Sequence, residues 1–212
     1  MFIRIQFAFL SSAKMRKRPQ QQRAKIIVEN ILEGAQKCIS DFGVLQLTTP
    51  KIAEKSGVSV GSIYQYFENK EQILAELLLR KSENLGQSFK QLVMLQQQTT
   101  IQDIITLSVA FGFETLKSDQ GFFIEILKNW DRYSDSEAAQ ILERHFLEIG
   151  MYIFGRYYPH WDFETLKHKS FVIINSTLFT MMRYASKNTF LIEEQRLQQE
   201  LAKMIVAFLA TK

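Results

Sequence analysis

The chain has 212 residues, of which 46% are hydrophobic and 23% charged, and this composition argues against a wholly disordered protein. Only 9 glycines and 3 prolines are present; because tight turns depend on these residues, their scarcity favours long helices over a β-rich fold. The single cysteine, Cys38, excludes an internal disulfide, argues against a cysteine-based zinc site, and fits a reducing compartment. We therefore expect an all-α protein.

The net charge of +4 is unevenly distributed. Residues 1–82 contain 13 Lys/Arg and 7 Asp/Glu, whereas residues 83–212 contain 13 and 15. A basic part joined to a mildly acidic remainder favours a polyanion-binding head on a body with another role, with chance as the alternative. However, six of the positive charges lie in residues 14–25, and residues 26–82 contain 6 Lys/Arg and 7 Asp/Glu. The charge alone therefore does not establish nucleic-acid binding.

The N-terminal residues 1–21 are expected to form a basic, flexible extension. Their apolar stretch 5–10 is shorter than the roughly 7–15 residues of a secretory core, and no window approaches the ~18 apolar residues of a membrane span. We therefore expect a cytoplasmic protein without membrane partners. Two questions stay open: whether residues 1–14 belong to the native protein, since Met15 could be the start, and whether the arm enters a DNA minor groove or only aids solubility.

The predicted elements begin with a helix whose apolar residues, from Ile27 to Phe42, recur at spacings of three and four. Gly43 is expected to end it in a left-handed conformation. Thr49 is the expected N-cap of a short helix, with Pro50 at its first position, and Ser56-Gly57 ends that helix.

Further capping patterns mark the helices that follow. Ser59 should cap a helix over about 60–67, and Asn69 with Gln72 forms a capping box for a longer helix. Five more helices are predicted, capped in two cases by Ser136 and Asp162, and residues 187–189 are expected to form the last loop. Their expected bounds are about 101–117, 121–130, 136–158, 162–186 and 192–210, which makes about nine helices in all.

The segment 48–70, TTPKIAEKSGVSVGSIYQYFENK, predicts a helix-turn-helix. Gly57 supplies the positive φ that its turn needs, while small Ala53 allows a close helix crossing. The core is predicted to contain Ile52, Val58, Ile63 and Phe67.

The second helix of this motif then exposes small, amide and phenolic side chains that suit DNA. Gln65 can pair with an adenine edge, and Tyr64 can reach a phosphate or a thymine methyl group. Lys70 is expected beside the DNA backbone as a point charge. Core packing of Tyr64 and an ordinary exposed role for Gln65 are the alternatives. The full set of predicted DNA contacts is Thr49, Lys51, Ser59, Val60, Gly61, Ser62, Tyr64, Gln65, Tyr66 and Lys70.

These residues resemble the DNA-binding head of the TetR family of bacterial transcriptional regulators over about residues 22–80. The matching positions are Thr48-Thr49, Ile52-Ala53, Gly57-Val58-Ser59, Tyr64 to Phe67, and Asn69-Lys70-Glu71. Pro50 departs from the pattern, because relatives often have a basic or polar residue there. The resemblance implies a three-helix DNA-binding domain at 22–69 and a helical effector-binding and dimerisation domain at 70–212.

The resemblance also implies a small-molecule effector in the C-terminal domain. That domain is rich in aromatic residues, which weakly favours an apolar or aromatic effector, although aromatic residues at helical spacing more often form the core. The candidate pocket residues are Phe113, Trp130, Tyr133, Phe154, Asn175 and Phe179.

A homodimer is expected to form through the last two helices, which have apolar faces, unless these faces pack only within their own subunit. The candidate interface consists of Phe171, Ile174, Leu178, Leu201, Ile205 and Phe208. Two recognition helices would then enter successive major grooves of a roughly palindromic operator.

No pattern supports an enzyme, a metal site or a cofactor. His145, His160 and His168 have no companions at metal-ligand spacing, and the phosphate-loop and nucleophile motifs are missing. We expect a repressor that a small-molecule effector releases from its operator. An activator or architectural DNA-binding protein without an effector, and a ligand-binding helical protein with a vestigial head, are the alternatives. The sequence identifies neither the effector, the operator nor the regulated genes.

Overall fold

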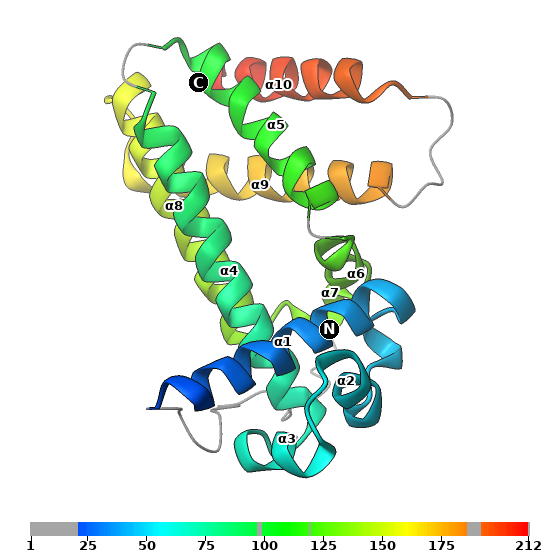
Figure 1. The fold of residues 1–212 in the computed structure, drawn as a ribbon. Coiled ribbons are helices and arrows are strands. Elements are labelled where there is room, and N and C mark those ends of the chain that lie inside the picture. The colour runs from blue at the N-terminus through cyan, green and yellow to red at the C-terminus, as the bar shows by residue number, and fades with distance from the viewer. Residues whose placement is uncertain (1–20, 97–98, 119, 186–191, 212) are drawn as a thin grey trace, which may run out of the picture. The chain divides into compact units, whose positions relative to one another are not determined.

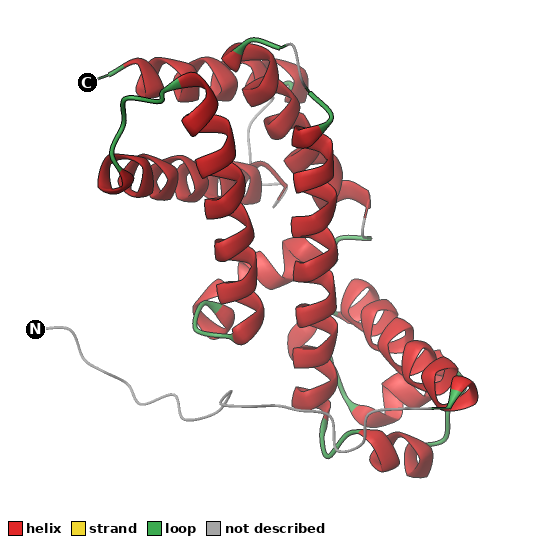
Figure 2. Cartoon of the chain, turned by 90° about the vertical axis from the view of Figure 1, so that its left-hand side faces the viewer, coloured by secondary structure: helices red, strands yellow, loops and turns green. Residues whose placement is uncertain are grey.

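A computed structural model describes residues 21–96, 99–118, 120–185 and 192–211. Within these ranges every regular element is helical, and Figure 2 shows no strand. The all-α prediction is confirmed. The described part contains ten α-helices and a short 3₁₀ helix: α1 Gln22–Phe42, η1 Val44–Gln46, α2 Thr49–Ser56, α3 Val60–Tyr66, α4 Lys70–Met94, α5 Ile101–Ser118, α6 Phe122–Lys128, α7 Trp130–Tyr133, α8 Glu137–Tyr157, α9 Phe163–Ala185 and α10 Glu194–Ala210 (Figure 1).

The helices form two compact units. The first unit contains the described residues up to Glu83 together with Asn129–Ile141, and the second contains Asn84–Lys128 and the chain from Leu142 onward. The long helices α4 and α8 therefore each contribute to both units. The domain boundary expected between residues 69 and 70 stays a prediction.

In the first unit, the predicted apolar face of α1 packs on α2. Ile31, Ala35 and Cys38 on this face are fully buried, as the helical spacing predicted, whereas Phe42 at the end of α1 is 47% exposed. Gly43 has φ 84° and ψ 156°, so the expected left-handed cap is wrong although its φ is positive. The extended ψ leads the chain directly into η1, and the Gly43 N–H still donates to the Ile39 carbonyl.

The start of α2 differs from the prediction by one residue. Thr48 is the N-cap, with extended φ and ψ, and its Oγ1 accepts a hydrogen bond from the Lys51 N–H over 3.4 Å. Thr49 is instead the first helical residue, and it is only 8% exposed. Either hydroxyl could cap, and Pro50 fits the second helical position because that N–H also has no partner within the helix.

Three other helix ends follow the predicted caps. The side chains of Asn69, Ser136 and Asp162 each accept a hydrogen bond from the backbone N–H three residues later. The Gln72 side chain completes its capping pattern by accepting from the Glu68 N–H rather than from Asn69. The prediction of a single helix over 121–130 is wrong, because α6 ends at Lys128 and the four-residue α7 follows. This extra helix raises the number of α-helices in the described residues to ten, where about nine were predicted.

The second unit has its own aromatic core. Phe89 of α4 stacks on Phe111 of α5 with ring centroids 5.2 Å apart, and the buried Phe113 belongs to the same cluster. A Cβ on Gly86 would collide with the ring of His145, so α4 and α8 approach closely there. None of the described helices combines the length and apolar character that a bilayer crossing demands. The predicted loop 187–189 lies outside the described residues.

Candidate nucleic-acid interface

The turn between α2 and α3 has the geometry of a helix-turn-helix. Ile52 of α2 and Ile63 and Phe67 at the end of the motif are at most 1% exposed, which confirms three of the four predicted core residues; Val58, the fourth, is partly buried. Gly57 is left-handed, with φ 67° and ψ 13°, which closes the turn without the strain that a side chain would bring. The Ser59 Oγ then caps α3 by accepting from the Ser62 N–H over 3.1 Å.

The outer face of α3 is open to solvent. Val60 is 37% exposed and Tyr64 45%, and Gly61 and Gln65 are exposed as well. Ser62 and Tyr66, also predicted contacts, are partly buried. Tyr64 therefore does not pack in the core, and this face is available to a partner. Contact of these residues with DNA stays a prediction.

Two predicted phosphate contacts, Lys51 and Lys70, are held against the protein by backbone carbonyls. The Lys51 Nζ donates to the Gln46 carbonyl over 3.1 Å, and the Lys70 Nζ donates to the Leu47 carbonyl over 2.8 Å. Both side chains thus anchor the η1 segment, a role that the sequence did not indicate. Thr49, predicted on the same surface, offers little to a partner because it is buried.

Sequence reasoning missed a cluster around the exposed Phe42 ring. The Nζ atoms of Lys51 and Lys55 lie 4.8 and 5.5 Å from its centroid, at distances that suit cation–π attraction. Lys55 also donates to the Asp41 carboxylate over 2.6 Å, and this hydrogen bond raises the pKa of Lys55. The spacing of Lys51 and Lys55, four apart on α2, was the signal that could have found the pair.

The six residues predicted to line an effector pocket are divided between the two units. Phe113 and Phe154 are buried in the core of the second unit, whereas Trp130 and Tyr133 belong to the first. Asn175 and Phe179 are exposed, and the Asn175 amide donates to a carbonyl of its own helix. The structure therefore does not gather these six into one cluster within either unit.

The predicted dimer face is also divided. Leu201 and Ile205 are 4% and 3% exposed, and they lie in the core of their own subunit, so they are not part of a free surface. This placement favours the alternative of packing within one subunit for these two residues. Phe171 is 66% exposed, while Ile174, Leu178 and Phe208 are partly buried.

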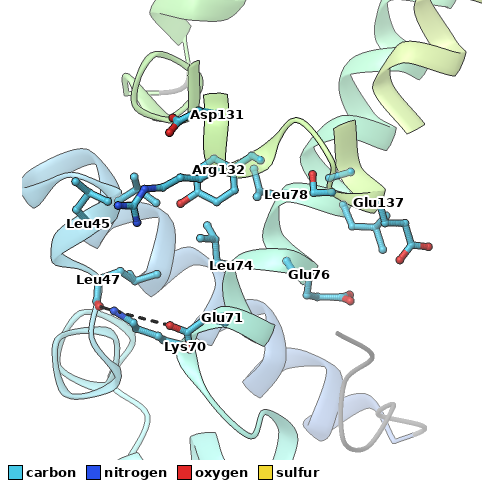
Figure 3. A pocket seen from close by; sticks show the side chains of 16 residues that line it. Leu45, Leu47, Lys70, Glu71, Leu74, Glu76, Leu78, Asp131, Arg132 and Glu137 are labelled. Atoms are coloured by element: carbon cyan, nitrogen blue, oxygen red, sulfur yellow. Dashed lines mark hydrogen bonds and ion pairs between the residues drawn. The ribbon is translucent and has the colours of Figure 1, made fainter. Parts of the chain in front are cut away.

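A cleft in the first unit brings together two of the predicted residues, Lys70 and Tyr133. Its volume is about 450 Å³, and it lies between η1, the start of α4 and residues 131–138 (Figure 3). No sequence pattern indicated it, because its walls are far apart along the chain.

Residues 31–77 match the family model of the bacterial regulatory proteins of the tetR family. Over 106 residues the chain is 31% identical to the fatty acid metabolism regulator protein of Bacillus subtilis, a match that covers 50% of this chain and 52% of that protein. The chain thus aligns with about half the length of this relative.

Three solved structures share the fold. The fatty acid degradation regulator FadR of Bacillus halodurans is 17% identical with a TM-score of 0.66, over 92% of this chain and all of that one. The FadR regulator of Bacillus subtilis in complex with stearoyl-CoA is 20% identical with a TM-score of 0.68, over 85% and 98%. SmeT, the repressor of the Stenotrophomonas maltophilia multidrug efflux pump SmeDEF, is 20% identical with a TM-score of 0.63, over 85% and 88%. Residues 31–77 therefore resemble the N-terminal domain of the tetR family of bacterial regulatory proteins, and the chain shares the fold of these solved regulators.

Proposed function

We propose that the protein is a cytoplasmic transcriptional repressor that binds operator DNA as a homodimer and is released by a small-molecule effector. One observation carries the proposal: the outer face of α3 exposes Tyr64 and Gln65 while its inner face is locked into the core by Ile63 and Phe67. The relatives are regulators rather than enzymes, and we propose no catalytic activity.

Recognition of the operator's base sequence is assigned to the exposed residues of α3. The Gln65 amide can pair with the donor and acceptor edge of adenine in the major groove. Gly61 adds no side chain, and no described atom lies within 4 Å of where its Cβ would be, so the backbone can approach the DNA closely there. Lys51 and Lys55 add positive charge for the phosphates, with Phe42 limiting the directions in which their side chains extend.

For the effector, we propose a long-chain fatty acyl thioester or a closely related acyl compound. The Bacillus subtilis FadR regulator was solved with stearoyl-CoA, and the Bacillus halodurans structure is that of a fatty acid degradation regulator. The aliphatic and aromatic side chains that form the core of the second unit are of the kind that would surround an acyl chain. In addition, the Ser170 and Thr177 hydroxyls of α9 are buried without a hydrogen-bond partner among the described residues. Such hydroxyls could bind a polar group of a ligand.

The homodimer is assigned to the outer faces of α9 and α10. Phe171, Phe179 and Met204 are 66%, 61% and 47% exposed, and exposed apolar residues in such number mark an association surface. A two-fold axis would present two α3 helices to one operator. The effector would favour a dimer state that binds the operator less well, with a coupling free energy of roughly 1–3 kcal/mol.

Operator binding is tested by fluorescence anisotropy of the full-length protein with DNA fragments from its own regulatory region, at several salt concentrations. We expect affinity to fall steeply with salt, and random DNA to compete poorly. Gln65→Ala and Tyr64→Ala should weaken operator binding, whereas Gln195→Ala, an exposed residue of α10, serves as the matched control. Wild-type affinity in both α3 variants would refute the assignment of α3.

Effector release is tested on the same protein–DNA complex. Stearoyl-CoA should lower the anisotropy, while coenzyme A without an acyl chain should not. DNA binding that neither compound changes would refute the acyl effector and would favour a regulator without one. Binding of stearoyl-CoA without any DNA binding would point to a vestigial head.

A further inference from the structure

The cleft in the first unit, which we call the η1–α4–α8 cleft, has the size of a ligand site. Its volume of about 450 Å³ falls within the range of roughly 300–1,000 Å³ that is typical of small-molecule pockets. All its walls belong to the first unit, so it is separate from the second unit, in which we placed the acyl effector.

The floor of the cleft is apolar. Leu47 and Leu78 are 2% and 6% exposed, Leu74 is partly buried between them, and all three line the same space. At the rim, Leu45 is 56% exposed although it is a large aliphatic residue. A ligand with an apolar portion would remove this surface from water, which is favourable in proportion to the area covered.

Two polar groups beside this floor have no side-chain partner in the described part of the chain. Arg132 is exposed and forms no ion pair with any described residue, and in Figure 3 its side chain extends toward Leu45. Tyr133 is 9% exposed, yet no described group forms a hydrogen bond with its hydroxyl. Burial raises the pKa of Tyr133, so the hydroxyl remains a neutral donor at physiological pH. A guanidinium and a hydroxyl donor together suit a carboxylate.

Four carboxylates line the cleft, and none of them forms an ion pair with Arg132. Glu76 forms an ion pair with Arg80, at 2.7 Å, and the Glu71 carboxylate lies 4.0 Å from the Lys70 Nζ. Asp131 and Glu137 are exposed in the first turns of α7 and α8, where the helix dipole favours negative charge, and in Figure 3 both point away from the leucine floor. Of the two cationic side chains that line the cleft, Lys70 lies near the Glu71 carboxylate, whereas Arg132 has no ion pair among the described residues.

We propose that the η1–α4–α8 cleft binds a small amphipathic carboxylate. The carboxylate accepts hydrogen bonds from Arg132 and the Tyr133 hydroxyl, and the aliphatic portion lies on Leu47, Leu74 and Leu78. This ligand site goes beyond the proposed function and does not depend on it. Because η1 and the start of α4 form one wall and residues 131–138 the other, the bound ligand ties these segments of the first unit together.

Octanoate is the probe, with octylamine and octanol as its cationic and neutral counterparts. The full-length protein is labelled with ¹³C at leucine methyl groups and titrated while methyl shifts are recorded by NMR. We expect octanoate to shift the signals of Leu74 and Leu78, and Arg132→Gln to weaken this binding by about tenfold, the size of a charge-assisted hydrogen bond. Tyr133→Phe should weaken it less, and Arg23→Gln, at the exposed start of α1, should leave it unchanged.

Each other result overturns the proposal. Stronger shifts with octylamine than with octanoate would identify a cation site. Equal octanoate binding by wild type and Arg132→Gln would show that the guanidinium is not used. Shifts confined to Leu201 and Leu209 would place octanoate in the second unit, and no shift at all would show that the cleft is empty surface. Thermal unfolding of each variant shows whether it is folded. The Arg23→Gln control is titrated and unfolded under the same conditions.

Discussion

Gly34 of α1 lies directly against Ser56 at the end of α2, at a distance that leaves no room for a side chain. A Cβ built on Gly34 would be 2.7 Å from the Ser56 Cβ and 2.9 Å from its backbone nitrogen. The two helices thus meet through a glycine, and their contact sets how α2 packs in the helix-turn-helix. Sequence reasoning had assigned the close approach to Ala53 instead, which is only partly buried.

Gly34→Ala should therefore destabilise the protein by about 1–3 kcal/mol, because a backbone atom cannot move aside as a flexible side chain could. Urea unfolding at equilibrium measures the change. Gly155→Ala is the matched control: it lies within α8, no atom is within 4 Å of its built Cβ, and alanine there should be neutral or stabilising. Equal effects of both variants would contradict the close-contact argument.

Gly61→Ala should separate stability from DNA binding. Alanine is preferred over glycine inside a helix by about 1 kcal/mol, and open space surrounds the new methyl group, so stability should stay or rise. Operator affinity should fall, because the methyl group would stand between α3 and the DNA. Unfolding curves and anisotropy titrations on one preparation test both parts. Unchanged affinity would show that this position does not face the operator.

Lys169→Met should loosen the end of α10. The Lys169 ammonium is mostly buried, and it donates to the Phe208 and Thr211 carbonyls over 3.1 and 2.7 Å. The Phe208 carbonyl still accepts from the Thr211 N–H and hydroxyl, but the Thr211 carbonyl loses its Lys169 donor, which should cost about 1–3 kcal/mol in unfolding free energy. Lys203→Met removes only an exposed ion pair with Glu200 and should change stability by less than about 1 kcal/mol. The prediction is wrong if the two variants unfold alike.

Cys38 gives a pH-dependent contribution to stability. Burial raises the pKa of its thiol above the ordinary value of 9.0, so the folded protein holds the proton more tightly than the unfolded chain. This contribution is complete at neutral pH and declines as the pH rises above about 9. The free energy of unfolding of wild type relative to Cys38→Ala should therefore decrease over that range. A constant difference between the two proteins would contradict the shift.

The sequence predicted best what depends on near neighbours. Three helix caps were predicted correctly, because each capping side chain accepts from a backbone N–H only three residues further along the chain: Ser59, Asn69 and Asp162. The left-handed turn at Gly57 was also predicted, since glycine adopts a positive φ without steric strain. Thr48 and Thr49 were confused because their chemistry is the same and only the backbone distinguishes them.

What the sequence missed depends on contacts between distant segments. Periodicity marked Leu201, Ile205 and Phe171 as apolar, but it could not tell that the first two pack within their own subunit and that the third is exposed. The cleft escaped notice for the same reason, since Leu47 and Tyr133 are 86 positions apart yet line one space. The DNA contacts remain predictions, because they require a partner.

The first unit is assembled from two separate stretches of chain, the residues up to Glu83 and Asn129–Ile141. A fragment cut after Glu83 would lack Tyr133, Ala138 and Ala139, which are buried in the intact protein, and would give Leu78 a new exposure to water. A chimera of two regulators joined at one position after Glu83 would therefore take the two stretches of the first unit from different proteins. Recombination with regulators of the same fold should keep residues 129–141 together with the described residues up to Glu83.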